Sequence, residues 1–187
     1  QGSVELHRHL GLPLLVSPGA ERVALSDLAQ SDEPPSVETW LRIARSAARQ
    51  LKKLHALGVL HRDIHPGNLL WSAASGQVAL IDFEHSVQWI RAEAAKADSN
   101  RLPSSLPYVA PEATGRMNVG VDERSDLYSL GAALYELLAG QRPFSASEPL
   151  ELVHQHLTQV PTAPRELRAD VPATVSAIVM KLLEKSP

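Results

Sequence analysis

Three polar side chains whose types and spacing could support acid–base and metal chemistry lie close together in the chain. Asp63 and Asn68 are five residues apart in "HRDIHPGNLL", and Asp82 ends the apolar run of "VALIDF". Pro66 and Gly67 break any helix between the first two, so a loop is expected there. A carboxylate can accept the proton of a hydroxyl. A second carboxylate with an amide oxygen suits Mg²⁺, whose other ligands are often phosphate oxygens. This set is what phosphoryl transfer requires, with Asp63 as base and with Asn68 and Asp82 on the metal.

Two helices and a hairpin are expected to position these residues. Ser36 can cap the first helix, and Gly58 can end it. Its apolar positions recur every three or four residues, at Val37, Trp40, Ala44, Ala47, Leu51 and Leu54. The runs "NLLW" and "VALIDF" are separated by "SAASGQ", which predicts a small hairpin after the loop.

The second helix is expected over "ERSDLYSLGAALYELLAG", where Gly140 ends it. Its apolar stripe is expected to face the core and consists of Leu127, Leu130, Leu134, Leu137 and Leu138. Two more helices are expected near 148–157 and 172–185. The run "LGLPLLVS" predicts a buried strand, and residues 85–107 lack periodicity and predict a long loop.

Composition excludes several classes of protein. The 187 residues are 44% hydrophobic and 21% charged, with a formal net charge of −3, which is typical of a soluble domain and does not favour a nucleic-acid partner. The chain has no cysteine, so disulfides and thiolate metal sites are excluded. No apolar run approaches the roughly 20 residues that a membrane-spanning helix needs, and the first residues do not resemble a secretory signal. A cytoplasmic location is expected.

Four motifs in order resemble the protein kinase domain. "HRDIHPGN" is similar to the catalytic loop and "IDFE" to the metal-binding loop. "YVAPE" resembles the end of the activation segment, and "DLYSLGAALYELLAGQRPF" resembles the central helix of the C-terminal lobe. The stretches "ATGRMNVGVDERSDLYSLG" and "EPLELVHQHL" further resemble the serine/threonine-kinase module of large bacterial signalling proteins, which precedes an ATPase-like region and a sensor histidine kinase.

The resemblance implies an α+β fold, mostly the helical C-terminal lobe with the last strands and hinge of the N-terminal lobe. Residues 1–21 would be the end of the N-lobe strands and the hinge, and residues 22–187 the C-lobe, ending before its last helix. The implied activity is ATP- and Mg²⁺-dependent phosphorylation of Ser or Thr in proteins, in bacterial signal transduction. The implied partners are a protein substrate and other domains of the parent chain.

The resemblance also implies a role for individual residues. Asp63 is the implied catalytic base, and Asn68 and Asp82 the implied Mg²⁺ ligands. The residues implied to contact adenine are Leu70, beneath the ring, and Val16, Ser17 and Gly19 in the hinge of residues 16–21.

Further residues have implied structural or regulatory roles. His61 and Phe83 would pack together, and Arg62 would pair with a phosphorylated activation loop, a structural salt bridge being the alternative. Ser105 stands where serine/threonine kinases commonly have Thr.

Two more implied roles belong to acidic side chains. Glu112 would anchor the segment through an arginine on a late helix. Asp126 would hold the catalytic loop by backbone hydrogen bonds, and a carboxylate that only favours the helix dipole is the alternative.

Two residues depart from the protein-kinase pattern. His65 stands where a lysine usually steadies the transferred phosphate, and Glu84 stands where Gly is usual. His65 is a candidate catalytic residue, with an ordinary surface histidine as the alternative. Both substitutions resemble aminoglycoside and choline kinases, so a small-molecule phosphotransferase remains an alternative. A pseudokinase that binds partners without catalysis is another.

The sequence contains no glycine-rich phosphate loop and no strand lysine with its helix glutamate. We therefore expect a fragment with little activity alone. The pairs His7/His9 and His154/His156 suggest a metal site, but residues two apart on a helix point to nearly opposite faces, and no third ligand is evident.

Overall fold

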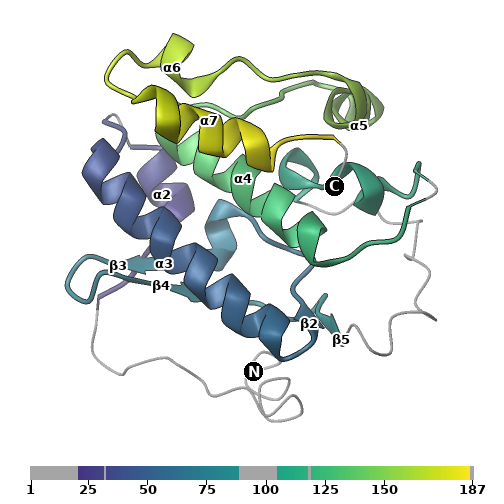
Figure 1. Cartoon of the computed structure of the whole chain (residues 1–187), viewed down its shortest axis with the longest axis horizontal. Coiled ribbons are helices and arrows are strands. Elements are labelled where there is room, and N and C mark those ends of the chain that lie inside the picture. The colour runs from purple at the N-terminus through teal and green to yellow at the C-terminus, as the bar shows by residue number, and fades with distance from the viewer. Residues whose placement is uncertain (1–20, 32, 89–104, 118, 186–187) are drawn as a thin grey trace.

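The computed structural model describes residues 21–31, 33–88, 105–117 and 119–185. Helices dominate it, and two small sheets accompany them, so the expected α+β composition is confirmed. The helices are α2 (Leu25–Ala29), α3 (Val37–Ala56), α4 (Glu123–Ala139), α5 (Pro149–Thr158), α6 (Pro164–Leu167) and α7 (Ala173–Leu182). Figure 1 shows α3 and α4 side by side in the centre, with α7 over α4 and the β3–β4 hairpin beneath α3.

Helix α3 forms as the sequence predicts. The Ser36 hydroxyl accepts a hydrogen bond from the Thr39 N–H, and this satisfies a donor that the first turn leaves free. Trp40, Leu51 and Leu54 of the apolar stripe are buried in the main core, while Val37 and Ala44 are half-buried at its edge. The helix ends before Gly58, whose positive φ of 71° suits the turn that leads into the next strand.

The predicted hairpin is present. Its strands are β3 (Leu69–Ser72) and β4 (Gln77–Leu80), which pair antiparallel with Leu69 opposite Leu80. Strand β1 (Val23–Ala24) adds to the outer side of β3. The second sheet pairs β2 (Val59–Leu60) with β5 (Val87–Gln88).

The expectation of an unstructured loop over 85–107 was wrong at both of its ends. Val87 and Gln88 form β5, because they pair with the strand that enters the catalytic loop. Residues 106–108 form the 3₁₀ helix η3 (Leu106–Tyr108). Two further 3₁₀ helices, η1 (Pro66–Asn68) and η4 (Pro111–Thr114), begin with Pro, whereas η3 has Pro107 at its second position. The intervening residues 89–104 lie outside the described part.

Helix α4 is buried on most sides and organises the core. Asp122 caps its start, and Gly140 ends it with a positive φ of 73°. Leu130, Leu134, Leu137 and Leu138 are buried as expected, but Leu127 is 36% exposed and was wrongly assigned to the stripe. The buried positions around it near the start of the helix are instead Ser125, Asp126 and Tyr128.

Neighbouring helices hold α4 closely. The Trp40 indole N–H of α3 donates to the Leu134 carbonyl at 2.9 Å. Gly131 lies against α7, where an added Cβ would come within 2.6 Å of Leu182. A side chain there would force α4 and α7 apart, so this glycine fixes their packing.

Two expected helices are present as α5 and α7, and two short ones, α2 and α6, were not predicted. The two histidines that were weighed as a metal pair have different surroundings: His154 is exposed, whereas His156 is fully buried against Phe144 and Tyr128. No group of three or more potential metal-binding His, Cys, Asp or Glu residues exists within the described ranges. The predicted N-terminal strand and His7/His9 lie outside them. No described helix is long and apolar enough to cross a membrane.

The buried His156 makes stability depend on pH. Burial, with the positive charge of Lys185 nearby, lowers the pKa of His156 from 6.5 to about 4. Between these values the unfolded chain binds the proton and the folded chain does not, so acidification favours unfolding. We expect the free energy of unfolding to fall by up to about 3 kcal/mol from pH 6.5 to pH 4 through this residue.

Urea denaturation at several pH values measures this effect. His156→Phe should flatten the pH dependence over this interval, although the pKa of buried His61 is also lowered and leaves a residual slope. His154→Gln removes an exposed histidine from the same helix and should leave the slope unchanged. Identical slopes for wild type and His156→Phe would contradict the assignment.

Candidate active site

The loop between β2 and β3 carries the polar cluster at the centre of the molecule. Most of its side chains are buried, among them Asp63 and Ile64, whereas Arg62 is exposed. Pro66 begins η1, and the Ile81 N–H donates to the Asn68 carbonyl at 3.1 Å. This bond joins the loop to the segment after β4, so residues 61–68 and 81–86 form one unit.

Asp126 holds the backbone of this loop from the first turn of α4. Its carboxylate is buried and accepts hydrogen bonds from the His61 N–H at 2.9 Å and the Arg62 N–H at 2.8 Å. These are the backbone contacts that the resemblance implies. A third contact, from His55 Nε2 at 2.9 Å, was not predicted, because a histidine in the last turn of an amphipathic helix is also typical of a solvent-facing position.

Two residues of the cluster have left-handed backbone conformations. Arg62 has a φ of 65° and Asp82 a φ of 60°, and they are the only non-glycine residues with positive φ in the described part of the chain. Such conformations cost about 1–3 kcal/mol each and persist only where surrounding contacts impose them. At Arg62 the contact is the bond to Asp126. At Asp82 the contact is a hydrogen bond in which its own side-chain Oδ1 accepts from the Glu84 N–H at 3.3 Å.

His61 connects residues 61–68 to residues 81–86 through its buried ring. Its ring packs on Phe83 with centroids 4.8 Å apart, and Nε2 lies 3.1 Å from the Ile81 carbonyl. Burial lowers the pKa of His61 although Asp126, Asp63 and Asp82 oppose that change, so the ring is neutral at pH 7 and Nε2 carries the donated proton. The predicted packing of His61 on Phe83 is therefore present.

Asp63 and Asn68 are brought together as expected. The Asn68 side-chain amide donates to the Asp63 backbone carbonyl at 3.0 Å and to its Oδ2 at 3.2 Å. Both amide protons are then used within the loop, which leaves Oδ1 of Asn68 as an acceptor. The Asp63 carboxylate keeps its second oxygen for another donor.

His65 lies beside this pair. Its Nδ1 accepts from the Gly67 N–H at 3.2 Å, and its Nε2 is 3.8 Å from Asp63 Oδ2. An added Cβ at residue 67 would come within 2.9 Å of the His65 ring, so glycine is needed for this approach. The ring also stacks on Tyr108 at 6.1 Å between centroids. His65 therefore faces Asp63 and is not an isolated surface histidine.

Asp82 follows β4 and is exposed, while Asp63 is buried. Both carboxylates act electrostatically on His61 and oppose the lowering of its pKa by burial. A carboxylate at Asp82 and the amide oxygen of Asn68 would together supply an all-oxygen donor set. This set fits Mg²⁺, which usually takes only one or two carboxylates and completes its shell with water and phosphate.

The remaining predicted residues lie around this cluster. Buried Ser105 begins η3, and its carbonyl accepts from the Tyr108 N–H at 2.8 Å. Glu112 is buried and accepts from the Ser125 hydroxyl, which is its hydrogen-bond partner among the described residues. Leu70 is half-buried on β3. The predicted hinge residues Val16, Ser17 and Gly19 lie outside the described part.

Comparisons with known proteins agree with this geometry. A family model described as a protein kinase domain matches residues 6–187. The chain is 32% identical over 177 residues to serine/threonine-protein kinase PknB of Mycolicibacterium smegmatis, covering 94% of this chain and 28% of that protein. It is 33% identical over 162 residues to serine/threonine-protein kinase PksC of Streptomyces coelicolor, covering 86% and 28%. The chain thus spans little more than a quarter of the length of these relatives.

Asp126 should contribute more to stability than a typical surface carboxylate. Asp126→Ala leaves the donors of His55, His61 and Arg62 without their acceptor and removes the restraint on the strained loop. We expect the free energy of unfolding to fall by about 3–5 kcal/mol, measured by urea denaturation. Asp27→Ala, at an exposed carboxylate of α2, is the matched control and should change it by less than about 0.5 kcal/mol. Equal effects of the two substitutions would contradict this role.

Proposed function

The chain belongs to the protein kinase domain family, and we propose that it is part of a bacterial serine/threonine protein kinase. The protein that contains it would transfer the γ-phosphoryl group of ATP to Ser or Thr hydroxyls of other proteins in signal transduction. In this proposal residues 1–21 end the N-lobe and form the hinge, and residues 22–187 form the C-lobe. The names of the relatives favour a protein hydroxyl over a small-molecule acceptor.

The bonded pair of Asp63 and Asn68, on a loop fixed by Asp126, is the observation that supports this proposal most directly. The Asn68 amide holds one oxygen of the Asp63 carboxylate in place. The other oxygen can accept a hydrogen bond from a substrate hydroxyl and take its proton as the oxygen attacks phosphorus. Because the loop backbone is held at two consecutive N–H groups, this oxygen keeps its direction without rearrangement.

The residues present fit Mg²⁺–ATP. Asn68 Oδ1 and the Asp82 carboxylate would hold the metal, which would neutralise phosphate charge when bound. Leu70 on β3 would contact adenine from below, and Val16, Ser17 and Gly19 would supply hinge contacts. His65, facing Asp63 with Nε2, would stand beside the transferred phosphate in place of the usual lysine.

Regulation through the activation segment is also proposed. The exposed Arg62 guanidinium has no hydrogen bond or ion pair to any residue in the described ranges, so it is available to a phosphorylated side chain. Ser105 would take the position of the usual threonine, and Glu112 would anchor the segment to α4 through Ser125. The glycine-rich loop and strand lysine are absent from this sequence, so we expect little activity from the chain alone.

The role of Asp63 can be tested in the natural protein that contains this chain. Asp63→Asn keeps the size of the side chain but removes its basicity, so we expect the rate of phosphoryl transfer from ATP to protein Ser or Thr to fall roughly 10²–10⁴-fold. Asp27→Asn, at an exposed carboxylate, should leave the rate unchanged. A wild-type rate no higher than that of Asp63→Asn would favour the pseudokinase alternative. Transfer to a soluble hydroxyl compound and to no protein would favour the small-molecule enzyme.

The assignment of Asp82 to the metal predicts a change in Mg²⁺ dependence. Asp82→Asn loses a charged oxygen ligand, so the Mg²⁺ concentration for half-maximal rate should rise at least about tenfold. Glu84→Gln removes the neighbouring exposed carboxylate and is the matched control. A similar rise in both variants would show that Asp82 acts only through its charge.

A further inference from the structure

A concave basic surface lies between α3 and the turn of the β3–β4 hairpin, away from the candidate active site. Its cations project from α3 and are Arg42, Arg45, Arg49 and Lys53. Ser75 and Gly76 of the hairpin turn, with Gln77 at the start of β4, form the opposite side. The hollow, called here the basic groove, has a volume of about 400 Å³, and no carboxylate of the described residues lines it. The function proposed above does not use it.

The cations form a row along one face of the helix. They are spaced by three, four and four residues, so their side chains project on the same face. With a rise of 1.5 Å per residue, the row extends about 16 Å along α3. None of the four forms an ion pair with a carboxylate within the described residues. The groove therefore presents unneutralised positive charge, although the net charge of the chain is −3.

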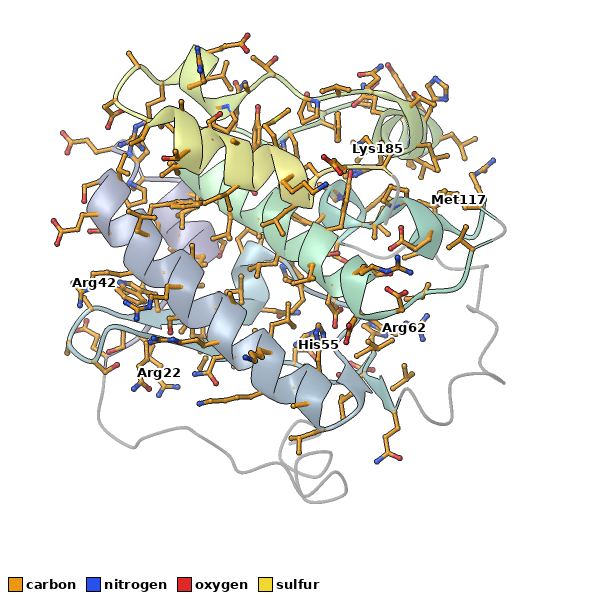
Figure 2. All side chains as sticks on the ribbon, viewed as in Figure 1. Arg22, Arg42, His55, Arg62, Met117 and Lys185 are labelled. Atoms are coloured by element: carbon orange, nitrogen blue, oxygen red, sulfur yellow. The ribbon has the colours of Figure 1, made fainter. Side chains whose placement is uncertain are left out.

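Buried contacts fix the two sides of the groove. The Ser46 hydroxyl of α3 accepts from the Val78 N–H of β4 at 2.8 Å. Arg42 lies over the Trp71 ring, with its guanidinium carbon 5.7 Å from the ring centroid, and Figure 2 shows it at the hairpin end of α3. Gly76, with a φ of 66°, permits this approach, because an added Cβ would come within 2.9 Å of the Arg42 guanidinium.

We propose that the basic groove docks an extended acidic segment of a partner protein. Alternate side chains of an extended chain lie about 6.6–7 Å apart on one face, close to the 4.5–6 Å rise between successive cations of the row. A segment of about five residues covers the row. A single phosphate group would not use it, since the cations are spread along a line and do not converge on one point.

Binding of a defined acidic peptide to the 187-residue chain tests this proposal without requiring kinase activity. The probe is fluorescein-labelled (Glu-Ser)₅, with (Gln-Ser)₅ as the uncharged control, and fluorescence anisotropy measures Kd at low and physiological salt. The groove variant is Arg45→Glu/Arg49→Glu, which leaves Arg42 and its packing on Trp71 intact. The matched control, Arg165→Glu/Lys181→Glu, makes the same change in net charge on α6 and α7, where both side chains are exposed. Thermal melts establish that both variants fold.

The proposal expects binding of (Glu-Ser)₅ that weakens with salt, and no binding of (Gln-Ser)₅. Kd should rise at least about fivefold in the groove variant and less than about twofold in the control variant. Equal weakening in both variants, or no binding by wild type at low salt, would overturn the proposal. Tighter binding of oligouridylate or of phosphatidylserine vesicles than of the peptide, lost in the groove variant, would overturn it in favour of a nucleic acid or a membrane.

Discussion

The buried carboxylate of Asp126 is the constraint on which the candidate active site depends. A buried charge without partners destabilises a fold by several kcal/mol, so this position requires all three of its donors. Two of them are consecutive backbone N–H groups, at His61 and Arg62. Consecutive N–H groups of an extended strand point in opposite directions, whereas these two converge on one carboxylate. The left-handed φ of Arg62 then sets the direction in which the chain continues to Asp63.

The first turn of α4 also holds the segment around Glu112, through Ser125, the residue before Asp126. Ser125 donates to Glu112 at the end of the activation-segment motif, and Asp126 accepts from the catalytic loop. Two loops that are distant in sequence are thus fixed by two adjacent side chains. Their relative position is only as precise as that of α4, which Trp40 of α3 and the close contact of Gly131 with α7 hold in the core. Both loops are therefore positioned by hydrogen bonds to the same helix, α4.

Local signals explain why much of this structure could be predicted from sequence. Helix α3 has a capping serine, a regular apolar stripe and a glycine at its end, and the hairpin has two apolar runs around a polar turn. Asp63 and Asn68 are separated by a short loop, so few arrangements were open to them. The resemblance then supplied the hydrogen bonds of Asp126, which no local pattern indicates.

The features that sequence reasoning missed depend on tertiary contacts. Strand β5 is only two residues long and exists because Val59 and Leu60 offer it a partner. Helix α2 is five residues long and has no capping side chain, so its stability comes from burial of Leu25. Leu127 faces solvent although its residue type suggests the core. His55 has its role only because α3 ends beside the first turn of α4. None of these four features produces a periodic sequence pattern from which it could have been predicted.

The hairpin links the basic groove to the candidate active site within one rigid unit. Asn68 immediately precedes β3 and Asp82 closely follows β4, while the turn at the far end of the same strands lines the groove. Four paired residues separate the two ends by about 14 Å, and the bond between Ser46 and Val78 fixes the ladder to α3. Helix α3 likewise carries the groove cations along its length and His55 at its end. A segment held in the groove is therefore tethered to the elements that position Asp63. Such tethering raises the local concentration of a partner without requiring a change of conformation.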